Sequence, residues 1–432
     1  MKIIRIVKTN KYALLYFLAA LLYFQPGRYV LGDSLARAWN WGLLLVSLSC
    51  VALYGLWYRD HGLKRSDIGV LVLVGAHIYC LVLASFLNKE ISDFRGGLIY
   101  AIMLVGFSAF ARLGLNLNPE QFFKGYTAAG VLMCGIHLVT ILLYQDSGGM
   151  RKGISVSLGR SYSDNWFFLG HANAAFFVVY PMIVMLFIYA YQFNRRMVKA
   201  AYAFLAFTLY CFFVQWTLAA LLGCLAFCAF LLLDQLPAAY TIHLTKKLLN
   251  LRLIWIVALI GESFLALFAG LSKYTDFLLE VFQKGQSINA RLEIWASVGE
   301  YILKKPLLGN GWNYETVMVS RITRSHTHNI LIEYLYCGGL LAVFLFILAV
   351  EFLQGQIDQQ GKSFYRNKAA RIAIYALIPY VLAATFDYYM YRYHTLMLYF
   401  AIWYLLSVSP GPRDPEEACT EQEKFGAEST EI

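Results

Sequence analysis

Two histidines and two arginines stand directly before a long apolar run in the segment RITRSHTHNILIEYLYCGGLL, which starts at Arg321. His328 is followed by Asn329 where the apolar run begins. A histidine there can accept a proton from a hydroxyl or donate hydrogen bonds to a phosphate near neutral pH. His326 and His328 would point to different sides of a helix, so we favour His328 as the reactive group. The alternative is that His328 and Asn329 only cap the following helix.

Basic residues in two polar segments could supply the positive charge that such a site needs. They are Arg151, Lys152, Arg160, Arg291, Arg321 and Arg324. Arginine binds phosphate oxygens through two parallel hydrogen bonds, which suits a pyrophosphate leaving group. Arg291 and Trp295 are four residues apart and share a face if their segment is helical. The alternatives are stacking of Arg291 on Trp295 and, for the other cations, contacts with solvent or lipid headgroups.

Other polar residues stand within or beside apolar stretches, where burial is costly and suggests function. His171 and Asn173 follow Arg160 in the segment GRSYSDNWFFLGHANAA. Acids near or inside later stretches are Glu262, Glu333 and Asp387. The alternative for His171 and Asn173 is a structural hydrogen bond between helices.

Membrane helices must position these residues, because 59% of the 432 residues are hydrophobic and only 14% are charged. Spanning a bilayer takes roughly 20 apolar residues in a helix, which pairs every backbone N–H and C=O within the segment. We predict an all-α polytopic membrane protein with about twelve transmembrane helices, at residues 12–25, 39–58, 67–87, 98–114, 123–144, 166–191, 200–214, 217–233, 253–271, 329–353, 371–389 and 395–409. The cysteines, mostly within these stretches, predict neither a disulfide framework nor a metal site.

The basic residues between the predicted spans indicate the orientation of the chain. They gather in alternate connections and near the N-terminus, a side that the positive-inside rule assigns to the cytoplasm. Residues 1–409 then form a single transmembrane domain with both ends of the chain in the cytoplasm. Residues 410–432 carry seven acidic residues against two basic ones, which predicts a disordered cytoplasmic tail.

The connection 272–327, between the ninth and tenth spans, is a large external loop and longer than a helix linker needs to be. Within it, SINARLEIWASVGEYILKKPLLGNGW has apolar residues at helical spacing from Ile288 to Ile302, and the pattern ends near Pro306. We therefore predict an amphipathic helix that lies along the outer surface and carries Arg291.

Three motifs, in this order, resemble those of the O-antigen ligase and polysaccharide polymerase superfamily of bacterial membrane glycosyltransferases. They are R…GHANAA, RLEIW…KKPLLGNGW and HTHNILIEYLYCGGLL, within residues 160–175 and 291–341. In that superfamily an arginine and an Asn-Ala pair enter a mid-chain helix. An arginine and a tryptophan then precede Pro-x-x-Gly-x-Gly, and a His-Asn pair opens a later helix.

The resemblance implies a metal-independent polymerase of capsule, exopolysaccharide or O-antigen that needs no cofactor. Such an enzyme transfers a glycan from an undecaprenyl-pyrophosphate carrier to the growing lipid-linked chain, outside the bacterial cytoplasmic membrane. By the same resemblance His328 is the catalytic base and Arg291 binds the pyrophosphate. Candidate substrate-binding residues are Arg160, Asn173, Trp295, Arg321, Arg324, His326 and Asn329. The implied partners are the lipid-linked oligosaccharide, membrane lipid, a flippase and a chain-length regulator, and not nucleic acid.

The chain departs from the superfamily pattern at one point. A Ser-Arg pair opens a later helix in many members, whereas FVQWTLAALLG places Thr217 there without an arginine. Arg151, Arg160, Arg321 or Arg324 could take the place of that arginine. The alternative functions are a ligase that moves finished glycan onto lipid A core and, in a different class, a transporter or flippase of lipid-linked sugars.

Overall fold

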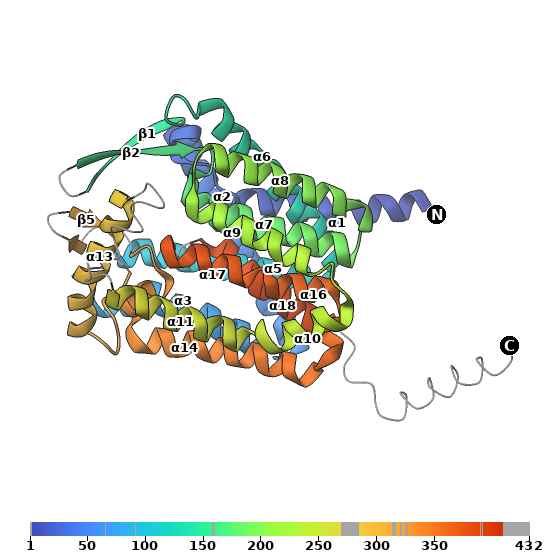
Figure 1. Cartoon of the computed structure of the whole chain (residues 1–432). Helices are drawn as coiled ribbons and strands as arrows, with labels where there is room; N and C mark the ends of the chain where they lie inside the picture. The colour runs from blue at the N-terminus through green and yellow to red at the C-terminus, as the bar shows by residue number, and fades with distance from the viewer. Residues whose placement is uncertain are drawn as a thin grey trace.

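The computed structural model describes residues 2–64, 66–90, 92–157, 160–268, 285–312, 317–319, 322–324, 327–388, 390 and 392–408. Most of these residues form helices that run along one bundle (Figure 1). The helices are α1 (Lys2–Tyr23), α2 (Arg28–His61), α3 (Asp67–Ile78), η1 (Tyr79–Leu83), α4 (Ala84–Leu87), α5 (Phe94–Leu117), α6 (Pro119–Tyr144), α7 (Ala172–Gln192), η2 (Arg195–Met197), α8 (Val198–Val214), α9 (Leu218–Leu233), α10 (Ala238–Leu248), α11 (Leu251–Phe268), α13 (Gly285–Lys304), α14 (Ile330–Gln360), α15 (Lys362–Arg366), α16 (Lys368–Tyr375), α17 (Leu377–Phe386), η3 (Tyr393–Thr395) and α18 (Leu396–Val408). The strands are β1 (Arg151–Ser157), β2 (Arg160–Phe167), β3 (Gly170–His171), β4 (Val317–Val319) and β5 (Ile322–Arg324).

The prediction of an all-α polytopic membrane protein is confirmed. Each of the twelve predicted apolar segments overlaps a helix. Within the described residues, eight helical segments are long and apolar enough to cross a bilayer, and three further apolar helices are shorter. The predicted amphipathic helix is also present, as α13, and it ends at Lys304 as the sequence pattern indicates.

The predicted start of the sixth span, at residue 166, is wrong. β1 and β2 form an antiparallel hairpin that continues into β3, and α7 begins only at Ala172. Side chains of α6 hold the intervening chain in its extended form. Thr140 Oγ1 accepts a hydrogen bond from the Phe168 N–H at 3.2 Å, and His137 Nδ1 accepts one from the Leu169 N–H at 3.1 Å. These bonds compete with helix formation and delay the helix start.

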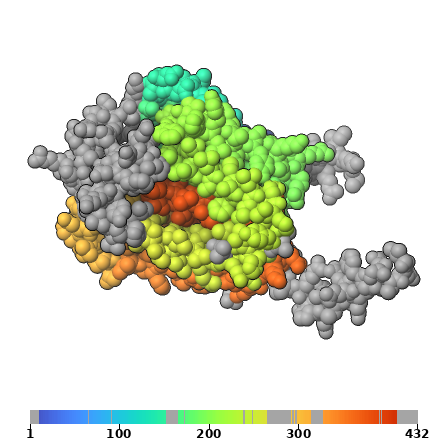
Figure 2. Space-filling model, viewed as in Figure 1, coloured from blue at the N-terminus to red at the C-terminus, as the bar shows by residue number. Residues whose placement is uncertain are grey.

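α7 forms the centre of the bundle, whereas α2 lies at its edge. In the most apolar 18-residue stretch of α7, 94% of the residues are buried inside the protein, against 11% in the corresponding stretch of α2. α7 packs against α6, α8, α16 and α18. On the face shown in Figure 2, the red surface of α17 lies between the green surface of α9 and the yellow-green surface of α11. α17 is thereby held between two helices on this face.

The two ends of the bundle differ. The hairpin of β1 and β2 gathers with β5 and α13 at one end, which we call the hairpin end, whereas α10 and the start of α1 lie at the opposite end (Figure 1). α16 and α17 together connect the two ends, because they form one candidate span of 19 residues.

A loop at residues 306–312 follows α13 and bonds to the middle of α14. Gly339 interrupts α14 with a φ of 63°, a left-handed conformation that glycine adopts without strain. Four backbone hydrogen bonds connect the loop to this kink: Asn310 N–H to Tyr336 O (2.8 Å), Gly311 N–H to Cys337 O (2.9 Å), Leu340 N–H to Pro306 O (2.8 Å) and Leu341 N–H to Leu307 O (3.2 Å). They pair backbone groups that would otherwise be buried without partners. The loop therefore fixes the end of α13 against α14.

Candidate active site

Three side chains from three different elements meet at the hairpin end around one carboxylate. His328 Nδ1 lies 2.7 Å from Asp387 Oδ1, and Arg291 Nη2 lies 3.7 Å from Asp387 Oδ2. Arg291 belongs to α13, His328 precedes α14 and Asp387 follows α17. The Asp387 side chain is 3% exposed, whereas those of His328 and Arg291 are 19% and 17% exposed. We call these three residues the Asp387 cluster.

The backbone before α14 presents His328 to this carboxylate. His328 has a φ of 59°, in the left-handed region that non-glycine residues occupy only when the surrounding structure enforces it. Its neighbours on both sides are held. The Thr327 N–H donates to Glu333 Oε2 at 2.8 Å, and the side chain of Asn329 caps α14 by accepting from the Ile332 N–H at 2.9 Å. Hydrogen bonds thus hold the residues on both sides of His328.

Two buried glutamates complete the support of the α14 N-terminus. Glu262 Oε2 accepts a hydrogen bond from the Leu331 N–H at 3.1 Å, and Glu262 Oε1 accepts one from Thr385 Oγ1 at 3.0 Å. Asn329 Nδ2 donates to the carbonyl of Thr385 at 3.1 Å. Glu262 and Glu333 are each 2% exposed. Their carboxyl groups join α11, α14 and the end of α17, so the chain segments that carry His328 and Asp387 are held together.

Opposing effects set the charge of Asp387, which directly follows the α16 and α17 span. Burial alone would raise the pKa of the Asp387 carboxyl. The hydrogen bond from His328 and the charges of His328, Arg291 and His171 outweigh burial and hold this pKa well below its usual range. Asp387 is therefore ionised at neutral pH and accepts the hydrogen bond that His328 Nδ1 donates. This bond selects the tautomer in which Nε2 is the basic nitrogen of the imidazole.

Comparison with known proteins gives one match. Residues 217–347 match the sequence model of a family described as O-antigen ligase. Over these residues, which are less than a third of the chain, the protein is similar to O-antigen ligases. None of the curated proteins and none of the solved structures matches the chain. The matched region includes Arg291 and His328, while Asp387 lies beyond it.

Within the matched region, α13 turns Arg291 and Trp295 toward the bundle. Trp295 is 6% exposed, and its Nε1 donates to the carbonyl of Thr327 at 2.9 Å. Arg291, one turn earlier, reaches Asp387. Trp295 thus anchors α13 to the residue before His328. The roles of Trp295 and Arg291 toward a substrate stay predictions.

The remaining predicted binding residues are more scattered. Asn173 lies in the first turn of α7, and its buried Oδ1 accepts no hydrogen bond within the described part of the chain. Asn329 is fully buried, and its contacts are those of a helix cap. Arg160 opens β2 at the tip of the hairpin, and Arg324 ends β5. The side chains of Arg160 and Arg324, and all of Arg321 and His326, lie outside the described residues.

The sequence marks Asp387 as an acid beside an apolar stretch, but it does not indicate that this acid contacts His328 and Arg291. It likewise marks Glu262 and Glu333, but it does not indicate that they support the α14 N-terminus. The feature that pointed to these three acids is their position beside or inside a membrane span, where a carboxyl group is costly to bury. Among the described residues, no group of three or more His, Cys, Asp or Glu residues is placed to hold a metal ion.

Proposed function

We propose that this O-antigen ligase-like protein is a polysaccharide polymerase. It transfers a glycan from an undecaprenyl-pyrophosphate carrier to the growing lipid-linked chain, at the outer face of the bacterial cytoplasmic membrane. The observation that carries the proposal is the Asp387 cluster, in which a carboxylate orients a histidine beside an arginine. The same logic of carboxylate, histidine and reacting hydroxyl operates in hydrolases with a catalytic triad.

In the proposed step, an acceptor hydroxyl attacks the anomeric carbon of the donor sugar. A new C–O bond forms as the bond between that carbon and the pyrophosphate oxygen breaks, and the pyrophosphate leaves with the bonding electrons. His328 Nε2 takes the hydroxyl proton, and the Asp387 carboxylate stabilises the imidazolium that results. Removing such a general base lowers a rate by roughly 10²–10⁴-fold.

Arg291 has the position and charge to stabilise the leaving pyrophosphate. Its guanidinium lies 3.7 Å from Asp387, which is beyond hydrogen-bond distance, so this carboxylate does not take up the guanidinium through a bidentate bond. Negative charge that develops on the leaving group is stabilised by a preorganised cation in a site shielded from water. The 17% exposure of the Arg291 side chain is consistent with partial shielding.

The charge distribution supports an external site. Lys246 and Lys247 lie in the last turn of α10, at the end of the bundle opposite α13 (Figure 1). The positive-inside rule assigns such short basic segments to the cytoplasm. The Asp387 cluster, at the hairpin end, would then face the outer side, where long connections are translocated regardless of charge.

The test is glycan transfer by the purified protein in vesicles, with a defined undecaprenyl-pyrophosphate-linked repeat unit as donor and acceptor. We expect long products from the wild type and losses of roughly 10²–10⁴-fold for His328→Ala and Arg291→Ala. His61→Ala is the matched control, because His61 is exposed at the end of α2. Wild-type rates in both cluster variants would refute the proposed mechanism.

A ligase is the second candidate, and the description of the matched family favours it. A ligase and a polymerase share the donor and the chemistry of the Asp387 cluster, and differ in the acceptor. Offering lipid A core oligosaccharide and a second lipid-linked repeat unit in parallel separates them. Transfer to the core alone would establish the ligase and reject the polymerase.

A further inference from the structure

A cavity of about 210 Å³ lies where the hairpin meets the bundle, and no residue of the Asp387 cluster lines it. Its walls come from the connection between α1 and α2, the end of β2, the side of α5 and the start of η3. The lining residues that matter most are Tyr23, Tyr100, Trp166, Gly170, Arg392 and Tyr393. One bound water molecule takes up about 10–15 Å³ of such space. A cavity of about 210 Å³ therefore has room for one sugar ring with its hydroxyl groups.

Two chain segments connect this cavity to the Asp387 cluster. The ring of Trp166 contacts His171 edge-on, with 6.2 Å between ring centroids, and the charge of His171 acts on Asp387. Arg392 follows Asp387 by five residues, in the connection between α17 and η3. A molecule in the cavity would therefore contact Trp166, which in turn contacts a histidine whose charge acts on Asp387.

The walls combine aromatic rings with a few polar groups. Trp166 and Tyr100 are half-buried, so part of each ring surface remains accessible, whereas Tyr23 and Tyr393 are buried and close the wall. Aromatic rings offer large apolar surfaces to the C–H faces of a sugar. Sugar hydroxyls need hydrogen-bond partners, and the guanidinium of Arg392, which also donates to the Leu169 carbonyl at 3.4 Å, supplies several N–H donors.

Charge argues against a pyrophosphate in this cavity. Two arginines line it, Arg28 and Arg392. Arg28 is paired with Asp33 at 2.7 Å, and its side chain is 73% exposed, so its charge is already balanced at the surface. The cation of the proposed leaving-group site, Arg291, belongs to the Asp387 cluster instead.

We propose that this cavity binds one saccharide residue of the glycan substrate, stacked on Trp166 and Tyr100 and hydrogen-bonded by Arg392. The inference rests on the proposed function, because it assumes a glycan substrate. It assigns Trp166, Tyr100 and Arg392 as binding residues that select the sugar and align it with His328.

The experiment measures binding without turnover. The probe is the free oligosaccharide that mild acid releases from the host's own lipid-linked repeat unit, titrated into purified His328→Ala protein by calorimetry. Trp166→Ala, Tyr100→Ala and Arg392→Ala are each added to that background, with gel filtration as the check of folding. Trp41→Ala is the matched control, because Trp41 is 65% exposed on α2 and outside the cavity.

We expect binding to weaken by about tenfold in each cavity variant and to stay unchanged in Trp41→Ala. Trp166→Phe should recover most of the affinity, which a merely disturbed hairpin would not do. Equal affinity in all folded variants, or displacement of the oligosaccharide by inorganic pyrophosphate, would overturn the proposal. The proposed function fails separately, if His328→Ala protein still transfers glycan, and that outcome leaves the binding measurement valid.

Discussion

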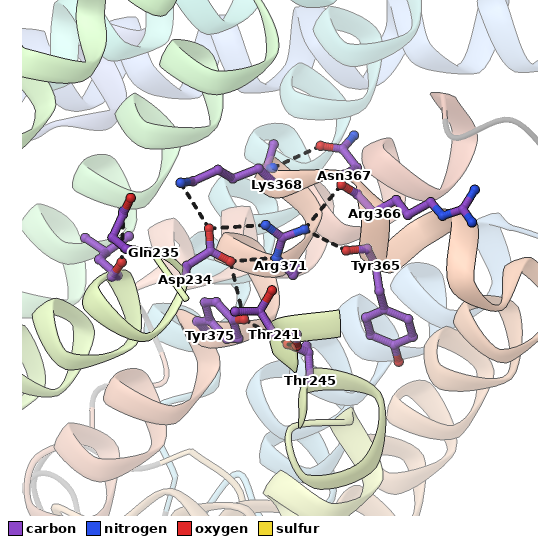
Figure 3. Close-up of polar contacts among 12 residues, drawn as sticks. Asp234, Gln235, Thr241, Thr245, Tyr365, Arg366, Asn367, Lys368, Arg371 and Tyr375 are labelled. Carbon is purple, nitrogen blue, oxygen red and sulfur yellow. Dashed lines mark hydrogen bonds and ion pairs between the residues drawn. The ribbon is translucent and has the colours of Figure 1, made fainter. Parts of the chain in front are cut away.

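Two buried aspartates occupy opposite ends of one membrane span and have different surroundings. Asp387 follows the end of α17, and Asp234 contacts Arg371 near the start of α16. Asp387 follows Arg371 by 16 positions, which correspond to about 24 Å along a helix. Asp234, Lys368 and Arg371 form what we call the Asp234 cluster (Figure 3).

The Asp234 cluster is saturated with strong contacts. Arg371 donates to both carboxylate oxygens, at 2.6 and 3.3 Å, and Lys368 Nζ lies 3.2 Å from Oδ2. Arg371 Nη1 also donates to the carbonyls of Tyr365 and Arg366, at 2.8 and 3.2 Å (Figure 3). The carboxylate is fully buried. The carboxylate of Asp234, the guanidinium of Arg371 and the ammonium of Lys368 each have a charged partner, which is typical of a structural ion pair.

The Asp387 cluster has the opposite character. Nδ1 of His328 lies 2.7 Å from the Asp387 carboxylate and Nη2 of Arg291 lies 3.7 Å from it, and both side chains are partly exposed. The histidine also sits in a strained backbone conformation. The comparison shows that burial of an acid does not by itself indicate catalysis. The proposed catalytic role of Asp387 rests instead on the titratable, partly accessible histidine beside it.

The largest expected effect is on activity at the Asp387 cluster. Asp387→Asn removes the charge that stabilises the His328 imidazolium, so we expect glycan transfer to fall by roughly 10²–10⁴-fold, by analogy with general-base catalysis. Transfer rates per amount of folded protein measure the effect, and Asp60→Asn, an exposed acid of α2, is the control. Wild-type transfer by Asp387→Asn would mean that Asp387, like Asp234, has no catalytic role.

At the Asp234 cluster we expect the effect to be on stability. Asp234→Ala leaves Arg371 and Lys368 without their carboxylate, and breaking a buried ion pair costs about 3–5 kcal/mol. Unfolding by SDS titration should show this loss, while the protein that remains folded transfers glycan at the wild-type rate. Asp60→Ala, which breaks only an exposed pair, should cost about 0–1 kcal/mol. A catalytic defect without a stability loss would reverse the comparison.

The pH dependence of stability sharpens the comparison further. The pKa of the Asp387 carboxyl is lower in the folded state than in the unfolded chain, because His328, Arg291 and His171 face it. The stability that this carboxylate contributes is therefore present above its ordinary pKa, near 4, and is lost as the pH falls below that value. The melting temperatures of wild type and Asp387→Asn should stay separated from pH 8 to pH 5 and converge below pH 4. Convergence already at pH 6 would mean that Asp387 is not held ionised.

The smallest effect concerns the helix cap behind His328. Asn329→Ala removes the side-chain acceptor for the Ile332 N–H, and a lost N-cap costs about 1 kcal/mol. Asn329→Asp retains that acceptor, although it removes the donor to Thr385. We expect thermal melting to rank wild type first, Asn329→Asp second and Asn329→Ala last. The reverse order of the two variants would show that the bond to Thr385 dominates.

Much of the fold could be predicted because membrane insertion is a local property of the sequence. A run of apolar residues must become a helix in a bilayer, wherever it stands in the chain. The approximate positions of the spans therefore followed from the apolar runs, and the helix that carries Arg291 and Trp295 followed from the spacing of its apolar residues. The start of α7 did not, because hydrogen bonds from His137 and Thr140 in α6 hold the preceding apolar residues extended.

The sequence alone determined the membrane class, the spans, the amphipathic helix and the choice of His328 and Arg291 as candidates, since each depends on neighbouring residues. Only the tertiary structure decided that both meet at Asp387, which lies 59 residues beyond His328. It also decided that Asp234 has a lysine and an arginine within 3.3 Å, whereas the nearest contacts of Asp387 are His328 at 2.7 Å and Arg291 at 3.7 Å. The physical reason is that contacts between distant side chains depend on how whole helices pack, and hydropathy along the chain does not encode that packing.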